Sequence, residues 1–265
     1  MRHLIDSLAY TNRLRTLPPS QKVGWAIALI CLSLVAPIGI QVAITLWLSV
    51  WVVGYARIPA QVYLKLTAIP LSFLLMSVPA LVLSVSWQPE VIPTDAQLGF
   101  IIGQLYLYLS QAGVAQAIAL LARAIATTTC LYFLLLTVPL ADILRLLSRV
   151  GCPELLVELL LLMYRAISVL SETAEQLIDA QKARSGFSSW RRAWRSVSLI
   201  ASQLLWRSLT NYRQLTLGLT ARGYNGRLRF WHPERYQSQP RYWLEAIVGY
   251  AILLALTGWH YAHRI

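Results

Sequence analysis

The residues best suited to chemistry in this chain are two arginines, Arg184 and Arg222, which stand 38 positions apart in similar contexts. The first lies in Ala183-Arg184-Ser185-Gly186 and the second in Ala221-Arg222-Gly223-Tyr224. A helix-forming stretch precedes each motif, and a glycine just beyond a helix is the usual left-handed stop signal. We therefore expect each arginine in the last turn of a helix, where the side chain can project past the helix end into a groove on another protein.

The chain contains no recognisable catalytic or nucleotide-binding motif. There is no Gly-x-x-x-x-Gly-Lys-Ser/Thr phosphate loop, no His-Glu-x-x-His and no Gly-x-Ser-x-Gly. The four histidines are dispersed, and the three cysteines are isolated, as is typical of small apolar side chains rather than disulfides. We therefore expect no catalytic residue, no metal site and no cofactor in this chain.

Composition predicts a membrane protein. The chain is 57% hydrophobic and only 13% charged, whereas a soluble domain carries about 25% charged residues. A helix that crosses the membrane needs roughly 20 apolar residues. The candidate spans are residues 23–36, 42–56, 66–87, 114–138 and 243–259. We expect an all-α polytopic membrane protein with about five transmembrane helices, and an interfacial position for residues 98–112.

The charges orient these spans. Residues 182–241 contain twelve Lys or Arg and one acid, whereas residues 87–97 contain two acids and no base. By the positive-inside rule, the N-terminus and residues 139–241 face the cytoplasm and residues 87–97 lie outside. Arg123 is the one charge well inside an expected span, and it could reach the membrane surface or pair across helices.

Four segments follow from this pattern. Residues 1–22 form a cytoplasmic N-terminal segment, 23–138 a transmembrane region of about four spans, 139–241 a basic helical region, and 242–265 a C-terminal transmembrane helix and tail. Within the basic region, one long helix is expected from Pro153 and a second from about Trp190. Such helices could lie on lipid headgroups, bind nucleic acid or dock a soluble partner. We expect them to contact membrane lipids in part. We expect no binding of nucleic acid, since no nucleic-acid-binding fold is recognisable.

A family resemblance covers about residues 115–226. It rests on the paired Ala-Arg motifs and on further matching segments in the same order: Leu121-Ala122-Arg123-Ala124, residues 136–144 (Leu-Thr-Val-Pro-Leu-Ala-Asp-Ile-Leu), Gly151-Cys152-Pro153-Glu154, Leu162-Met163-Tyr164-Arg165, Glu172 and Glu175. This pattern resembles the transmembrane T component of energy-coupling factor (ECF) transporters, of the cobalt type known as the CbiQ family. The first motif departs from it by having Ser185 where the second has Gly223.

The resemblance implies a non-enzymatic subunit of an ECF-type ABC importer in the cell membrane. Its partners would be two ABC-type ATPase subunits and a separate substrate-binding membrane subunit. The ATPase-coupling residues would be Ala183, Arg184 and Ser185, with Ala221, Arg222 and Gly223. A divalent metal ion such as cobalt is the implied substrate, and a vitamin is the alternative within the same class.

A membrane-embedded enzyme that acts on a lipid-linked substrate is the alternative from another class. Its candidate acids are Asp142, Glu154 and Glu158, and the last two are four residues apart on one expected helix. A two-carboxylate site could use such a pair, although an acid at a helix start is also explained by the helix dipole.

Overall fold

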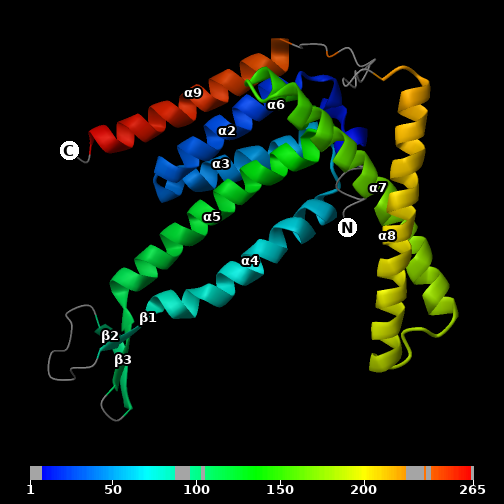
Figure 1. The fold of residues 1–265 in the computed structure, drawn as a ribbon. Helices are drawn as coiled ribbons and strands as arrows, with labels where there is room; N and C mark the ends of the chain where they lie inside the picture. The colour runs from blue at the N-terminus through cyan, green and yellow to red at the C-terminus, as the bar shows by residue number, and fades with distance from the viewer. Residues whose placement is uncertain (1–7, 87–95, 103–104, 225–235, 237–239, 264–265) are drawn as a thin grey trace. The chain divides into compact units, whose positions relative to one another are not determined.

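The computed structural model describes residues 8–86, 96–102, 105–224, 236 and 240–263. The chain divides into two compact units. The first comprises Met1–Ile143 and Arg235–Ile265, and the second comprises Leu144–Glu234. Figure 1 labels their helices and strands.

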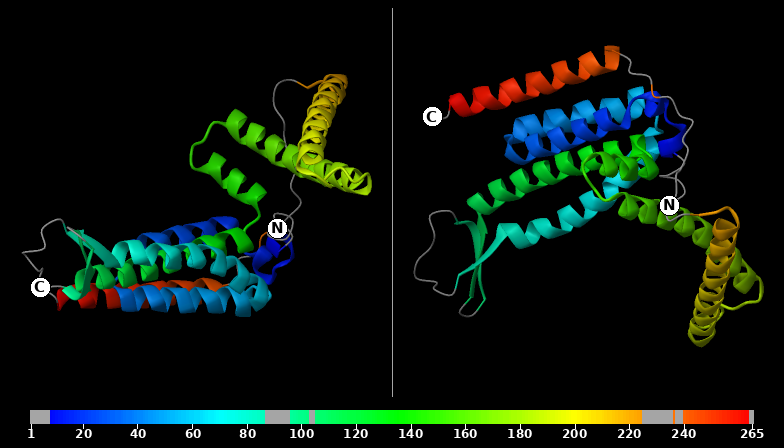
Figure 2. Two further views of the ribbon diagram at one scale, coloured as in Figure 1. Left: turned by 90° about the horizontal axis from the view of Figure 1, so that it is seen from below. Right: turned by 45° about the horizontal axis from the view of Figure 1, so that its top comes forward.

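Five apolar helices run side by side in the described part of the first unit (Figures 1 and 2). They are α2 (Pro19–Val35), α3 (Ile38–Val50), α4 (Ala60–Val82), α5 (Gln111–Thr137) and α9 (Pro240–Ala262). A 3₁₀ turn, η1 (Arg13–Thr16), precedes α2, and a π-helical turn, η2 (Trp51–Tyr55), continues α3.

The lengths of these helices fit a membrane. In the described residues, four stretches are long and apolar enough to cross it, namely Ile38–Tyr55, Ala60–Val82, Gly113–Thr137 and Pro240–Ala262. Helix α2 is also apolar but has 17 residues, which corresponds to about 26 Å. The expected helical, multi-pass membrane architecture is confirmed.

Prolines and one buried glutamine explain how α2 turns into α3. Each helix begins directly after a proline, Pro18 and Pro37, because the fixed φ of proline is tolerated at a helix start. The amide nitrogen of Gln41 donates to the carbonyl oxygens of Ser33, at 3.0 Å, and Ala36, at 2.9 Å. A helix end leaves such carbonyls without intrahelical partners, so Gln41 stabilises the tight connection between the two helices.

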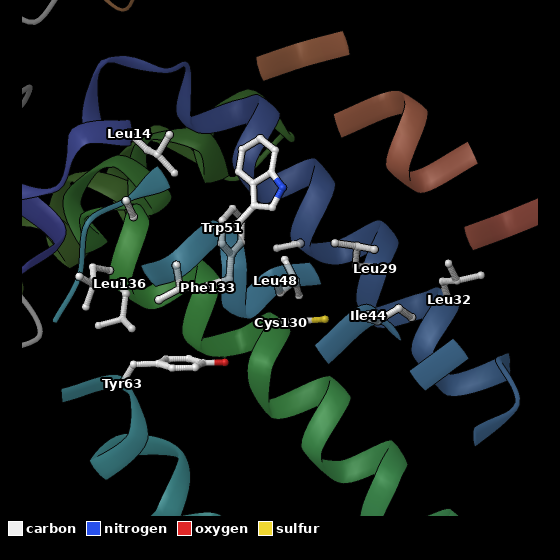
Figure 3. Packing of buried hydrophobic residues seen from close by; sticks show 14 of the residues in the cluster. Leu14, Leu29, Leu32, Ile44, Leu48, Trp51, Tyr63, Cys130, Phe133 and Leu136 are labelled. Atoms are coloured by element: carbon white, nitrogen blue, oxygen red, sulfur yellow. The ribbon is translucent and has the colours of Figure 1, made fainter. Parts of the chain in front are cut away.

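Helix α5 is the centre of the first unit, since it packs against α2, α3 and α4. Its Cys130, Phe133 and Leu136 are buried with Leu29 of α2 and Leu48 of α3 (Figure 3). In a bilayer such contacts stabilise a bundle by close packing rather than by removing apolar surface from water.

A three-stranded antiparallel sheet lies between α4 and α5 and is the one departure from the all-helical expectation in the described residues. Its strands are β1 (Leu83–Ser86), β2 (Ala96–Ile102) and β3 (Leu105–Ser110), in the order β1-β3-β2. Leu107 of β3 is paired with Val85 on one side and Phe100 on the other. The expected span 66–87 is therefore too long at its end, because α4 stops at Val82 and the chain continues as a strand.

The described part of the second unit is helical, as expected. Helix α6 (Leu140–Arg149) lies across the boundary between the units, and α7 (Glu154–Ala183) and α8 (Trp190–Ala221) follow. Helix α7 begins after Pro153, and α8 begins after Ser189, whose side chain accepts a hydrogen bond from the backbone nitrogen of Arg192 at 3.5 Å. Both expected helix starts are confirmed, and α7 and α8 cross each other (Figures 1 and 2).

Candidate functional site

The first arginine motif forms a regular helix end. Helix α7 ends at Ala183, and Arg184 is its C-cap with φ −91° and ψ 14°. Ser185 then adopts a left-handed conformation with φ 54°. The backbone nitrogens of Ser185 and Gly186 donate to the carbonyls of Lys182, at 3.0 Å, and Gln181, at 2.8 Å. These two bonds define a Schellman motif, which satisfies carbonyls that the helix end leaves open.

The second motif repeats this geometry. Helix α8 ends at Ala221, Arg222 is the C-cap with φ −96° and ψ 14°, and Gly223 has φ 68°. The nitrogens of Gly223 and Tyr224 donate to the carbonyls of Thr220 and Leu219, both at 3.0 Å. Two arginines 38 residues apart are thus carried by nearly identical backbone turns. Each arginine lies one residue beyond its helix, so the expected position inside the last helical turn is wrong.

The expected role of Gly186 as the left-handed stop of α7 is wrong. Ser185 occupies the position that corresponds to Gly223, and Gly186 follows it. The structure gives Gly186 another reason to be glycine, because a Cβ there would collide with Ser196 Oγ and lie 2.9 Å from the Gln181 carbonyl oxygen. Ser196 Oγ donates to the Gly186 carbonyl at 3.0 Å, so this close approach fastens the start of α8 to the end of α7.

Both arginine side chains are available to a partner. Arg184 and Arg222 are exposed, and neither guanidinium has a hydrogen bond or an ion pair within the described part of the chain. Because Arg184 lies near the start of α8 and Arg222 at its end, the 32 residues of α8 separate them by about 48 Å.

The helices that carry the arginines also expose much apolar surface. In the described second unit, the buried hydrophobic side chains are Val157 and Ile200. Many other large apolar side chains of α7 and α8 are more than 40% exposed, and they include Leu155, Met163, Trp190, Trp194, Leu205, Trp206 and Leu217. Both helices therefore present apolar side chains to their surroundings, and contiguous apolar surface of this kind marks contact with a partner or a membrane.

The acids considered for an enzymatic site are arranged differently. Glu154 is exposed at the start of α7, whereas Glu158, four residues on, is buried, so the pair does not present two carboxylates to one open surface. Asp142 is buried in the first turn of α6. In the part of the chain that the structure describes, no group of three or more His, Cys, Asp or Glu side chains could hold a metal ion.

A polar cluster that the sequence did not predict lies at the end of α5 that is expected to face the cytoplasm. Lys22 of α2 is buried, and its ammonium group donates to the carbonyls of Leu14 and Thr137, both at 2.9 Å. The side-chain nitrogen of Asn12 donates to the carbonyls of Ala9, at 2.7 Å, and Leu136, at 3.2 Å. Two side chains from the N-terminal segment and α2 thereby cap the end of α5 just before α6 begins.

Replacing Lys22 by methionine is expected to lower the free energy of unfolding by about 3 kcal/mol, because the carbonyls of Leu14 and Thr137 would stay buried without the charged donor. Thermal unfolding of the purified protein in detergent measures this. Lys65→Met is the matched control, since Lys65 is exposed on α4 and should change stability by less than about 0.5 kcal/mol. Equal stability of the two variants would contradict a structural role for Lys22.

The chain is similar to known cobalt transport proteins. The family model of CbiQ, described as cobalt transport protein, matches residues 11–231. The cobalt transport protein CbiQ of Rhodobacter capsulatus is 33% identical over 226 residues, which cover 85% of this chain and 86% of that protein. CbiQ of Salmonella typhimurium is 29% identical over 225 residues, or 84% of this chain and 97% of that protein.

Another relative is a longer protein that is named as a fusion. The putative fused cobalt transport protein CbiMQ of Methanocorpusculum labreanum is 26% identical over 232 residues, which cover 84% of this chain and 37% of the fusion. The match to the family model extends over most of this chain. It includes both arginine motifs and the apolar helices α2, α3, α4 and α5, but not α9. The chain belongs to the CbiQ family of cobalt transport proteins.

Proposed function

We propose that this chain is the transmembrane coupling subunit of an ECF-type ABC importer, which transmits motion of two ATPase subunits to a separate substrate-binding membrane subunit. The observation that carries the proposal is the pair of exposed arginines on two nearly identical helix ends. Two equal arginine sites suit two equal grooves, one on each of two ATPase subunits. The guanidinium group is suited to such grooves because its planar fork binds carboxylates and carbonyls with defined geometry.

The mechanism is mechanical rather than catalytic. When the two ATPase subunits close on ATP, they draw the ends at Arg184 and Arg222 with them. Helices α7 and α8 are joined where Ser196 Oγ contacts the Gly186 carbonyl, so a pull on one end is transmitted to the crossing. The exposed apolar surface of both helices then repacks against the substrate-binding subunit.

Cobalt is the proposed substrate because the relatives in two bacteria carry the name cobalt transport protein. The relative named as a CbiMQ fusion supports a second membrane protein as a partner. Recognition of the ion would belong to that partner. The basic second unit would face the cytoplasm, where the ATPase subunits are.

Reconstitution tests this function. Proteoliposomes that contain the ATPase subunits, the substrate-binding subunit and this chain should take up radioactive cobalt when ATP is supplied. Vesicles without this chain should show no ATP-dependent uptake and should not retain the ATPase subunits. Uptake that is independent of this chain would contradict the coupling role. Turnover of a lipid-linked substrate by the chain alone would favour the enzyme alternative.

Gly223→Val is expected to impair recruitment of the ATPase although it removes no charge. A β-branched residue in the left-handed conformation of Gly223 is strained by roughly 1–2 kcal/mol, so the turn that presents Arg222 would rearrange. Among the described residues other than its chain neighbours, no atom lies within 4 Å of a Cβ at this position, so the expected effect rests on backbone strain and not on a clash. Co-purification of tagged ATPase subunits with the variant is the measurement.

Gly218→Val is the matched control for this change. Gly218 lies inside α8, and beyond its own stretch of helix a Cβ there also meets no atom of the described chain within 4 Å. Valine fits helical backbone angles at this position, so ATPase recruitment should stay near the wild-type level. Equal losses in the two variants would show that the turn at Gly223 is not what matters.

A further inference from the structure

Arg123 lies deep within a membrane-spanning helix. The apolar stretch of α5 runs over Gly113–Thr137, so Arg123 is ten residues from its start and fourteen from its end. At 1.5 Å per residue these separations are about 15 Å and about 21 Å. Long basic side chains near helix ends reach the membrane surface, but Arg123 is nearly three turns from the closer end.

The side chain of Arg123 is open to the surroundings of the bundle. It is exposed, as are Gln116 and Leu120, and Thr127 is half-buried. Their spacing of three and four residues places all four on one face of α5, which we call the Arg123 face. Thr127 Oγ donates to the carbonyl oxygen of Arg123 at 3.0 Å, so this hydrogen bond involves the backbone of Arg123 and not its guanidinium group.

Within the part of the chain that the structure describes, the guanidinium of Arg123 has no hydrogen bond and no ion pair. A guanidinium carries five N–H donors and a permanent charge. In the bilayer interior such a group is strongly unfavourable unless it is paired, and paired intramembrane charges mark functional contacts. The Arg123 face therefore requires an anionic partner at the same depth.

We propose that a transmembrane helix of the substrate-binding membrane subunit packs on the Arg123 face and pairs one of its carboxylates with Arg123. This inference rests on the proposed function, and it adds the surface and the chemistry by which the two membrane subunits recognise each other. A carboxylate on a partner helix matches the depth of Arg123, whereas lipid phosphates lie at the membrane surface. Leu120 supplies the apolar contact of helix packing, and Gln116 supplies a hydrogen-bonding group on the same face.

Co-purification of the assembled importer from membranes tests the pairing, with this chain carrying the tag. Arg123→Ala and Arg123→Glu should each lower recovery of the substrate-binding subunit at least tenfold, whereas recovery of the ATPase subunits should stay at the wild-type level. Arg123→Lys should retain the subunit to within about threefold, because an ammonium group also pairs with a carboxylate. Ile118→Ala is the control, since Ile118 is exposed on α5 but lies off the Arg123 face, and it should have little effect.

Charge exchange identifies the partner directly. Replacing each intramembrane Asp or Glu of the substrate-binding subunit by Lys should reveal one position that restores its recovery with Arg123→Glu. In a cysteine-free background, Leu120→Cys should cross-link to the same helix, whereas Leu46→Cys, on an exposed position of α3, should not. Full recovery of the subunit with both Arg123→Ala and Arg123→Glu, as expected if lipid headgroups satisfy Arg123, would overturn the proposal.

The outcome is separable from a failure of the proposed function. If the unaltered chain retains neither ATPase nor substrate-binding subunit, the coupling role itself is wrong, and with it the pairing that depends on it. If the unaltered chain retains both and the Arg123 variants lose neither, only the pairing is wrong.

Discussion

Replacing both Arg184 and Arg222 by alanine is expected to abolish ATPase association and ATP-driven uptake while the chain still inserts into the membrane. Each truncation would leave a partner acid or carbonyl unpaired, at a cost of about 2–5 kcal/mol. Because about 1.4 kcal/mol corresponds to a tenfold change in affinity, either single variant should bind the ATPase at least tenfold more weakly. Both arginines are exposed and outside the apolar spans, so insertion should not depend on them. Co-purification and uptake are the measurements.

Arg191→Ala is the matched control for this prediction. Arg191 is an exposed arginine near the start of α8, and a solvated surface charge contributes about 1 kcal/mol or less. Lysine at position 184 or 222 should rescue binding poorly, because a point charge does not reproduce the guanidinium fork. Wild-type ATPase recovery and uptake with the double variant would show that these motifs do not couple.

Impermeant thiol labelling should give an all-or-none result for the orientation of the chain. With Cys31, Cys130 and Cys152 replaced, Ser188→Cys should react only after the membrane is opened, because the basic residues 182–241 are expected in the cytoplasm. Ser188 is exposed between α7 and α8, so access within an opened vesicle is not limiting. Thr94→Cys, which falls outside the described residues, should react in intact cells.

The opposite labelling pattern would reverse the topology. It would also place both arginine motifs on the side of the membrane where ATP is absent. The labelling therefore tests the orientation on which the coupling proposal depends, without requiring any partner subunit.

Hydropathy predicted the helices well because a crossing is set mainly by the length of an apolar run. The apolar stretch Gly113–Thr137 differs by one residue at each end from the expected span 114–138. The sheet was missed because its strands, residues 83–86, 96–102 and 105–110, are largely apolar, and a helix-length average cannot distinguish apolar strands from an apolar helix. The alternation of leucine and tyrosine over residues 105–109 has the period of two that indicates a strand.

The candidate site was predictable in its residues but not in its backbone. Glycine is the residue that most often adopts the left-handed conformation, so Gly186 was expected to do so after α7. When the two motifs are aligned on their arginines, however, Ser185 corresponds to Gly223, and Ser185 is the left-handed residue. The burial of Lys22 could not be predicted from its neighbours. It depends on the carbonyl of Thr137, 115 residues away, and in sequence Lys22 is simply one more basic residue before an apolar run.

The length of α8 sets a condition on any partner that binds both arginines at once. Bivalent binding gains from effective concentration only when the spacing of the two sites matches that of the two ligand groups. Because α8 is a rigid spacer of 32 residues, one inserted residue would displace Arg222 by about 1.5 Å along the helix and rotate it by about 100°. Avidity would then be lost although every contacting side chain was unchanged, so the number of residues in α8 is itself a determinant of specificity.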